Sequence, residues 1–389
     1  MENEKTEAQF EQKGPKKREA KKISPLMLIG IAALVLLVVI AAAIAVADRA
    51  DTADNNRTHG VYTINSESVL DLGAYTSGVA VLTSNSVDYV DSFGNLMSAN
   101  EHTYTNPVMI TSGKNLVLYD RGGNLMKIEK NASLYKSFTF DAPVSCADIT
   151  ANGTYAYVLN GDSGYQSHLF VYSYKGKKLF EWSSAEYVVR VSVSDSGNSA
   201  AVSTVSVENA DTLSKVYLFQ FNKNTYDYVE EFIGETVFDI DFAGGKKLAV
   251  LTDRGAYLMT AKGERSALCE YSANELNHTD LKKGSLGIVS VNLYGDTNNT
   301  KVYLFDKGYK NVSEQSYQNA ISGVIADLSY YAVIFDKEIY ILNSKGIETG
   351  HIQLDEICMD AVVSGGKLYV LTSGGIQHFG LHETVGDDK

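Results

Sequence analysis

Few residues of this sequence stand in a spacing that supports catalysis or metal binding. The string closest to a serine nucleophile is Gly161-Asp-Ser-Gly164, which lacks the Gly-x-Ser-x-Gly spacing that lifts a serine out of a strand-to-helix turn. Asp296-Thr-Asn-Asn299 has oxygen ligands but not the order of a calcium loop, so a polar hairpin tip is the simpler interpretation. The sequence therefore predicts no catalytic residues, no metal site and no cofactor.

The histidines and cysteines do not change this prediction. Among 7 histidines only His378 and His382 are four residues apart, and in an extended chain that spacing has no special meaning. The 3 cysteines are far apart and unpaired in spacing, which argues against a disulfide framework or a zinc site. We expect all three to be small buried side chains: Cys146, Cys269 and Cys358.

The elements that must position any site are short strands in a repeating unit. After residue 60, apolar and polar residues alternate, with Gly, Asn, Asp and Lys at the breaks. In each copy an apolar segment such as VAVLT (79–83) or LYVLT (368–372) is followed by a second strand-like segment such as VYLFQFNK (216–223) or IYILNSKG (339–346). Eight copies begin at apolar residues 36 to 49 residues apart: Val69, Val108, Val144, Val188, Val237, Leu276, Ile321 and Ile357.

This period predicts an all-β fold, an eight-bladed β-propeller of four-stranded blades. Propeller blades repeat about every 40–50 residues, and their sheets stack radially because one sheet cannot bury both faces alone. The last copy stops one strand short while a spare strand, VYTIN at 61–65, precedes the first, so we expect that strand to complete the last blade. Seven blades, an open β-solenoid and two β-sandwiches remain as alternatives.

A transmembrane α-helix is predicted before the propeller. Residues 26–47 carry no charge, and at about 1.5 Å per residue they span a hydrocarbon layer of about 30 Å. Six Lys and Arg residues between 13 and 22 precede this run, which places the N-terminus in the cytoplasm. Ala45-Val46-Ala47 also fits a signal-peptide cleavage site, but the run exceeds the usual signal core of about 7–15 residues, which favours an uncleaved anchor.

These features predict five segments in a single-pass protein of the cell membrane. They are a basic cytoplasmic tail (1–25), the transmembrane helix (26–47), an extracellular linker (48–60), the propeller (61–383) and a C-terminal tail (384–389). Beyond residue 25 the chain holds 27 basic and 42 acidic residues, so the outer part is strongly acidic. Nucleic acid is therefore excluded as a partner, and a protein or a component of the cell envelope is expected.

In three copies the connection between the second and third predicted strands is longer than in the others, at 160–168, 205–215 and 292–301. Because strands alternate in direction, these links emerge on one face of the disc, and binding residues are common on loops held by a rigid scaffold. Simple tolerance of hairpin tips to insertion is the alternative. The candidate binding residues are Asp162, Tyr165, Glu208, Asp211, Tyr294 and Asp296.

The chain resembles an uncharacterised family of membrane-anchored propeller proteins of Gram-positive bacteria, a domain of unknown function. The segments that carry this resemblance are SGVAVLT (77–83), HTYTNP (102–107), YDRGGNL (119–125), ANGTYAYV (151–158) and residues 178–194. The resemblance implies the topology and the fold, and brings no activity or site residues with it. The chain is also similar to propeller lipoproteins that scaffold envelope machinery, but their lipid-attachment cysteine is absent here.

A binding or scaffolding module is the function that the sequence favours, because a propeller offers a broad rigid face and no catalytic constellation is visible. A glycan-acting enzyme is one alternative, since carboxylates from different blades would leave no linear motif; raised pKa values in the central channel would support it. A sensor is the other, although a cytoplasmic tail of about 25 residues is too short to fold alone and needs a separate partner.

Overall fold

The computed structural model describes residues 61–381, apart from residues 77, 163, 224, 245, 246, 261 and 283. The predicted cytoplasmic tail, transmembrane helix, linker and C-terminal tail lie outside the described residues. In the part of the chain that is described, no helix is long and apolar enough to cross a membrane.

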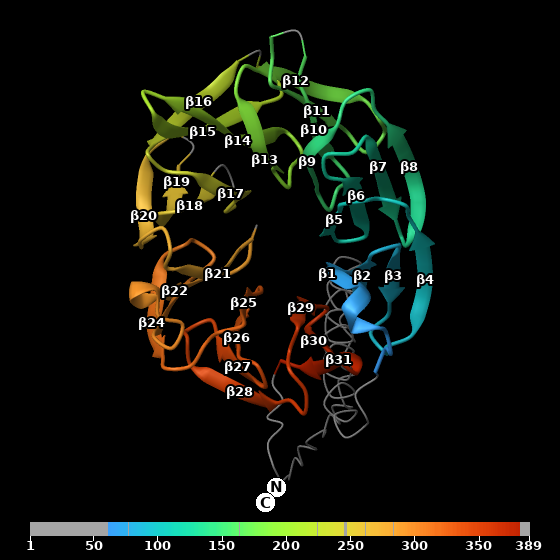
Figure 1. Ribbon diagram of the computed structural model, residues 1–389, viewed down its shortest axis with the longest axis vertical. Helices are drawn as coiled ribbons and strands as arrows, with labels where there is room; N and C mark the ends of the chain where they lie inside the picture. The colour runs from blue at the N-terminus through green and yellow to red at the C-terminus, as the bar shows by residue number, and fades with distance from the viewer. Residues whose placement is uncertain are drawn as a thin grey trace, which may run out of the picture. The chain divides into compact units, whose positions relative to one another are not determined.

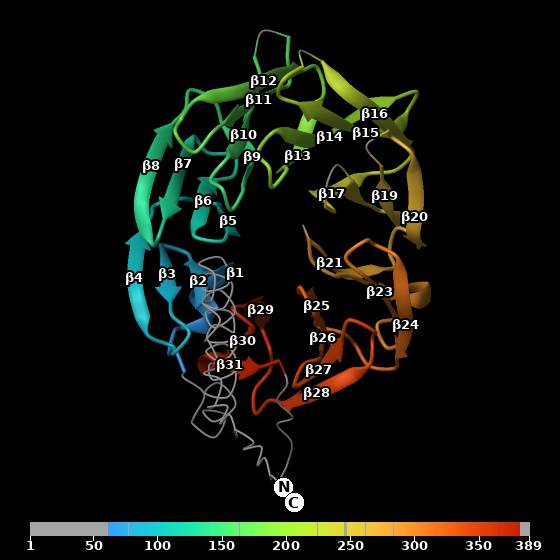
Figure 2. The same cartoon turned by 180° about the vertical axis from the view of Figure 1, so that it is seen from behind.

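Eight antiparallel sheets stand around a central opening (Figures 1 and 2). Seven of them have four strands and the last has three, and within each sheet consecutive strands are neighbours from the centre outwards. Such an up-and-down order follows from the short turns between the repeated strand lines. The eight-bladed β-propeller is therefore confirmed, and the alternatives of seven blades, a solenoid and two sandwiches are wrong.

The two inner layers of strands line and surround the channel. The first strands of blades one to eight are β1 (Val69–Tyr75), β5 (Pro107–Ser112), β9 (Val144–Ile149), β13 (Tyr187–Val193), β17 (Val237–Phe242), β21 (Leu276–Leu281), β25 (Gly323–Ala326) and β29 (Asp360–Ser364). The second strands are β2 (Gly78–Thr83), β6 (Asn115–Asp120), β10 (Tyr155–Asn160), β14 (Ser199–Glu208), β18 (Leu248–Thr252), β22 (Gly287–Asn292), β26 (Tyr330–Ile334) and β30 (Lys367–Thr372).

The two outer layers complete the blades. The third strands are β3 (Ser86–Val90), β7 (Leu125–Lys130), β11 (Ser167–Tyr172), β15 (Asp211–Gln220), β19 (Gly255–Met259), β23 (Thr300–Phe305), β27 (Glu338–Asn343) and β31 (Gly375–Gly380). The fourth are β4 (Leu96–Glu101), β8 (Ser133–Thr139), β12 (Lys178–Ser184), β16 (Tyr226–Ile233), β20 (Arg265–Glu270), β24 (Asn311–Tyr317) and β28 (Glu348–Gln353). Two short 3₁₀ turns are η1 (Ser66–Ser68) and η2 (Leu293–Gly295).

The second strands form the core because a neighbouring blade covers each of their faces. Every residue of β2, β6, β18 and β22 is buried, which explains why these strands read as continuous apolar runs rather than alternating ones. The fourth strands face solvent, as the nearly fully exposed β8 shows. Burial of apolar surface therefore occurs mainly between blades, so no blade is stable without its neighbours.

The ring closes between blades eight and one. Tyr62 pairs with Ile376 of β31 through two backbone hydrogen bonds of 2.9 Å, so the N-terminal segment adds to the edge of the three-stranded blade as expected. The pairing is one isolated bridge rather than the predicted strand. A core cluster that includes Leu72, Val81 and Tyr369 packs the two blades together. The last open edge is thereby covered.

Candidate functional site

Charged residues occupy equivalent positions on the inner strands. Asp71, Asp239 and Asp360 each lie opposite the last leucine of the adjacent second strand. The same register position holds Arg190 in blade four and His278 in blade six. A strand lining a channel exposes these positions to the enclosed solvent, which is why ionisable residues are tolerated between apolar ones.

A second set of equivalent positions lies two residues further along the same strands. It contains Asp148, Asp241 and Asp280, together with Ser192 in blade four. Because all eight inner strands run in the same direction, the two sets form two successive levels of the channel. Six aspartates therefore line the channel wall on five of the eight blades.

Several of these carboxylates connect neighbouring blades. Asp148 of blade three accepts a hydrogen bond of 2.6 Å from the backbone N–H of Val193 in blade four. Asp241 of blade five accepts one of 2.6 Å from the Ser192 hydroxyl of blade four. Hydrogen bonds to a charged acceptor are among the stronger ones in proteins. These aspartates therefore have a structural role, and they fix the orientation of the channel wall.

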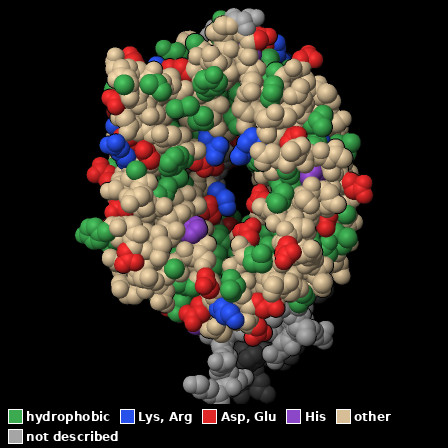
Figure 3. All heavy atoms as spheres, viewed as in Figure 1, with side chains coloured by type: hydrophobic (Ala, Val, Ile, Leu, Met, Phe, Trp, Pro, Cys, Tyr) green, Lys and Arg blue, Asp and Glu red, His purple; other side chains and the backbone are tan. Residues whose placement is uncertain are grey.

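Three cationic side chains balance part of the negative charge. Arg190 lies 3.4 Å (Nε–Oδ1) from Asp239, and Lys282 lies 3.1 Å (Nζ–Oδ2) from Asp280. The Asp280 carboxylate is the main reason that the pKa of Lys282 is raised. A cavity of about 260 Å³ is lined by Arg121 and Arg190, and one of about 290 Å³ by Lys282. Figure 3 shows Lys and Arg side chains at the central opening, with Asp and Glu among them.

Two carboxyl groups meet where the ring closes. Burial, and then the charge of Asp360, raise the pKa of Asp71 from 3.8 to about 7. Burial also raises the pKa of Asp360. Interaction with the Leu72 backbone N–H partly offsets this rise for both carboxyl groups, so both lie close to that N–H at the seam. A carboxyl group that exchanges its proton near neutral pH is thus built into the channel.

The first predicted loop carries Asp162 and Tyr165 between β10 and β11. The Asp162 carboxylate lies 3.5 Å from the Nε2 of His168, and the Tyr165 and His168 rings are 5.7 Å apart. Tyr165 is 48% exposed. The loop therefore presents an aromatic and an acidic side chain to solvent.

The second predicted loop is not a loop. Strands β14 and β15 pair from Ser199 to Glu208 and turn at Asn209 and Ala210, whose φ angles of 51° and 69° are typical of a tight two-residue hairpin turn. Glu208 and Asp211 thus form the last pair of a long projecting hairpin. The polar composition of 205–215 suggested a link, whereas the alternation of β-branched and polar residues extends both strands.

The third predicted loop carries Tyr294 and Asp296 and includes η2. Tyr294 is 90% exposed and has a left-handed backbone conformation with φ of 60°, which is uncommon for an aromatic residue. The Glu275 carboxylate holds this conformation by accepting hydrogen bonds from the backbone N–H groups of Tyr294 (2.9 Å) and Ser272 (2.7 Å). These bonds are the main cause of the lowered pKa of Glu275.

The six predicted residues share one face but are not brought together. They belong to blades three, four and six, and blade five separates the last loop from the other two. The sequence reasoning missed the channel residues. A signal was available, because an aspartate follows two or four residues after the apolar start of several copies, as in Val237-Phe-Asp-Ile-Asp.

The cysteines and the tryptophan have structural roles. Each thiol is buried, and burial raises the pKa of all three to about 12: Cys146, Cys269 and Cys358. Trp182 packs between blades three and four, with ring centroids 5.1 Å from Tyr217 and 5.0 Å from Phe219. Among the described residues no group of His, Cys, Asp and Glu is arranged to hold a metal ion.

The fold places the chain among β-propellers with WD40-like four-stranded repeats. A crystal structure of the eukaryotic initiation factor is 15% identical, with 86% of this chain and 90% of that chain covered and a TM-score of 0.56. The C-terminal WD40 domain of Sif2 is 12% identical over 82% and 97% of the chains, with a TM-score of 0.55. Apo AztD from Citrobacter koseri is 13% identical over 74% and 86%, with a TM-score of 0.50. At these identities the likeness establishes the fold alone.

Within this class the chain belongs to a family of unknown function, DUF5711, whose model matches residues 51–381. The expected membership of an uncharacterised family is therefore confirmed. Comparison with functionally curated proteins gives no match.

Proposed function

We propose that this protein is a membrane-anchored, extracytoplasmic binding or scaffolding module whose partner is a protein or a component of the cell envelope. The charge-free run at 26–47 and the basic residues before it support the anchor and its orientation. The closed ring supports the binding role, because a rigid scaffold loses little conformational entropy when its loops engage a partner. The loop face with Asp162, Tyr165, Glu208, Asp211, Tyr294 and Asp296 is the proposed contact surface.

The observation that carries the binding role is the conformation of Tyr294. The Tyr294 side chain is 90% exposed and therefore has no packing role in the fold. Its backbone is in a left-handed conformation, and the backbone N–H donates a hydrogen bond to the Glu275 carboxylate. Residues held in sparsely populated backbone conformations are concentrated at functional sites. Tyrosines are also enriched among the residues that dominate binding energy at interfaces.

The acidic outer part of the chain favours a cationic partner. With 42 acidic against 27 basic residues beyond residue 25, long-range attraction favours positive molecules over polyanions. Retention of the purified protein on immobilised polylysine and on immobilised polyglutamate tests this. Stronger retention on polylysine at low salt is expected, and stronger retention on polyglutamate would contradict the proposal.

Protease treatment of intact cells that express the full chain tests the topology. Proteolysis should remove the propeller and leave a protected fragment of the tail and the membrane segment. A propeller that is cut only after the cells are lysed would overturn the extracytoplasmic placement. Antibodies against the tail and against a propeller loop distinguish the two results.

One observation favours a second candidate, an enzyme that acts on glycans. Glycosidases pair a protonated carboxyl group with an ionised one, and Asp71, whose pKa is raised to about 7 beside Asp360, has the property that the protonated partner requires. Release of reducing ends from wall-derived or chitin oligosaccharides measures this activity. Activity that Asp71→Asn abolishes would establish the enzyme and displace the binding role as the main function.

A further inference from the structure

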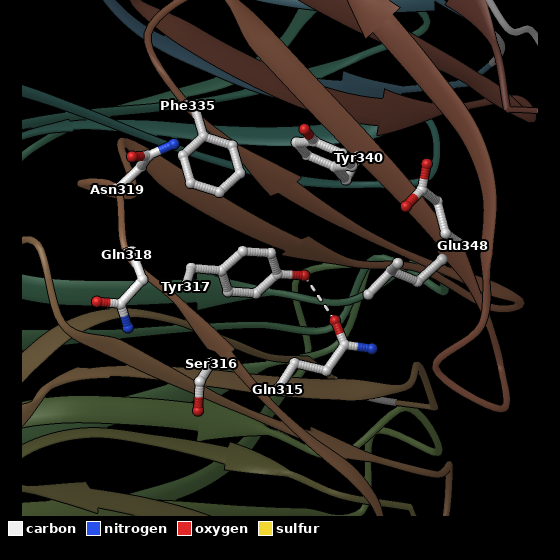
Figure 4. Close-up of a pocket in the computed structure, with 9 residues that line it drawn as sticks. Gln315, Ser316, Tyr317, Gln318, Asn319, Phe335, Tyr340 and Glu348 are labelled. Atoms are coloured by element: carbon white, nitrogen blue, oxygen red, sulfur yellow. Dashed lines mark hydrogen bonds between the residues drawn. The ribbon is translucent and has the colours of Figure 1, made fainter.

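A cleft lies between blades six and seven, outside the channel. Its volume is about 340 Å³, and it opens beside the connection between the two blades and the turn that follows β26. The residues that line it belong to β24, β27, β28 and these two connections. They are Gln315, Ser316, Tyr317, Gln318, Asn319, Phe335, Tyr340, Leu342 and Glu348 (Figure 4).

Three aromatic rings form the apolar walls of the cleft. The Tyr317 and Phe335 centroids are 5.5 Å apart at 59°, and those of Phe335 and Tyr340 are 5.6 Å apart at 84°. The rings are therefore steeply inclined to one another and surround one space instead of stacking, as Figure 4 shows. His351 stacks on Tyr340 with centroids 4.6 Å apart and fixes that ring. Such an arrangement presents aromatic faces to a ligand.

The hydroxyl groups of the two tyrosine walls are already engaged. The Tyr317 hydroxyl donates to Gln315 Oε1 (2.6 Å), and Gln315 Nε2 donates to the Gly346 carbonyl (2.6 Å). The Tyr340 hydroxyl donates to Glu338 (3.1 Å). The aromatic walls therefore offer few unused hydrogen-bond partners, and the polar side chains that remain in the lining are the exposed Ser316, Gln318 and Asn319.

The charge of the cleft is negative. No lysine or arginine lines it, whereas the exposed Glu348 carboxylate does. Within the described part of the chain, the structure gives the Glu348 side chain no ion-pair partner. The charge of Glu348 contributes to the raised pKa of both Tyr317 and Tyr340, so this carboxylate is close to two of the three rings.

We propose that this cleft binds a quaternary ammonium group, with the rings of Tyr317, Phe335 and Tyr340 as its walls and the Glu348 carboxylate as its counter-ion. Aromatic faces attract cations through their quadrupoles, and aromatic cages recognise choline-type groups in this way. A quaternary ammonium carries charge without hydrogen-bond donors, which suits aromatic walls whose hydroxyl groups are already bonded. The site goes beyond the proposed function and does not depend on the Tyr294 loop.

Calorimetric titration of the full chain with choline tests the site, with 3,3-dimethylbutan-1-ol as the neutral analogue of the same shape. Choline should bind saturably, and the alcohol should bind at least about tenfold more weakly, because only choline carries the positive charge that the ring faces and the Glu348 carboxylate attract. Equal binding of the two molecules would show an apolar pocket and overturn the proposal. Absence of saturable choline binding would overturn it as well.

Substitutions in the cleft test whether its side chains bind choline. Phe335→Leu keeps an apolar side chain of similar size and should weaken choline binding about tenfold, and Glu348→Gln should weaken it and reduce its salt dependence. Phe93→Leu, in an exposed turn of blade one outside the cleft, is the matched control that should bind normally. Unfolding curves check that each variant is folded. Choline affinity unchanged in both Phe335→Leu and Glu348→Gln would contradict the assignment.

Two further arms identify the source of the group. Binding of free choline but not of phosphatidylcholine vesicles assigns a soluble ligand, and binding of the vesicles assigns a lipid headgroup; either result supports the site. Preferential binding of uncharged N-acetylglucosamine oligomers would overturn it. These results leave the Tyr294 contact surface untested, so failure of the cleft and failure of the proposed function are distinguishable.

Discussion

Replacement of Asp71 by asparagine should stabilise the protein at alkaline pH and have little effect in acid. The folded chain holds the Asp71 proton up to about pH 7, compared with 3.8 for an ordinary aspartate, because burial and the neighbouring Asp360 disfavour its charge. The stabilisation from this raised pKa is complete below about pH 4 and is lost as the pH rises through 7.

The magnitude follows from the same values. A change in pKa from 3.8 to about 7 corresponds to about 4 kcal/mol of folding free energy lost between acid and alkaline pH. Because Asp71 is half-buried and faces a solvent-filled channel, water reduces this cost, and about 4 kcal/mol is the upper limit. An asparagine keeps the shape and an acceptor oxygen but cannot ionise.

Urea unfolding of the purified wild-type protein and of Asp71→Asn at pH 4 and pH 8 measures the effect. The variant should be more stable at pH 8, by 1 kcal/mol or more, and nearly equal to the wild type at pH 4. Asp211→Asn, at an exposed hairpin tip, is the matched control and should change neither value. Parallel pH profiles for the wild type and Asp71→Asn would refute the reasoning about the seam.

Three other predictions concern the core. Trp182→Ala should lower the free energy of unfolding by about 3 kcal/mol in chemical denaturation, since it empties the contact between blades three and four; a loss below 1 kcal/mol would contradict that packing. Tyr89→Phe removes the 2.6 Å hydrogen bond to the buried Glu129 and should cost about 1.5–3 kcal/mol in the same assay, whereas an unchanged midpoint would show that the bond is dispensable. A thiol reagent should modify no cysteine in the native protein and all three after unfolding, and fast native labelling would contradict their burial: Cys146, Cys269 and Cys358.

Much of the fold could be predicted because the repeat carries its own pattern. Four of the eight predicted starts coincide with the first residue of an inner strand, as at Val69 and Val237, and the others lie within three residues. The missing strand of the last copy predicted the closure at Tyr62. The second strands stood out because burial on both faces demands continuous apolar runs, as in Gly78–Thr83.

The candidate site was less predictable. Asp71 and Asp360 are separated by almost the whole propeller in sequence and meet only because the ring closes, so no linear motif joins them. The cleft between blades six and seven likewise combines Tyr317 with Tyr340, whose proximity depends on how two sheets stack. Hairpin tips were visible in the composition, but polar residues alone could not distinguish the extended hairpin at Glu208 from a loop.

The central claim is that the propeller works by engaging a partner through its loop face. A photo-crosslinking phenylalanine derivative in place of Tyr294, in cells that express the full chain, tests this most directly. The same derivative at Phe93, which is 70% exposed in the turn between β3 and β4 on the opposite face, is the control. The account predicts one discrete crosslinked species from position 294 and none from position 93. Equal crosslinking from both positions, or none from position 294, would contradict it.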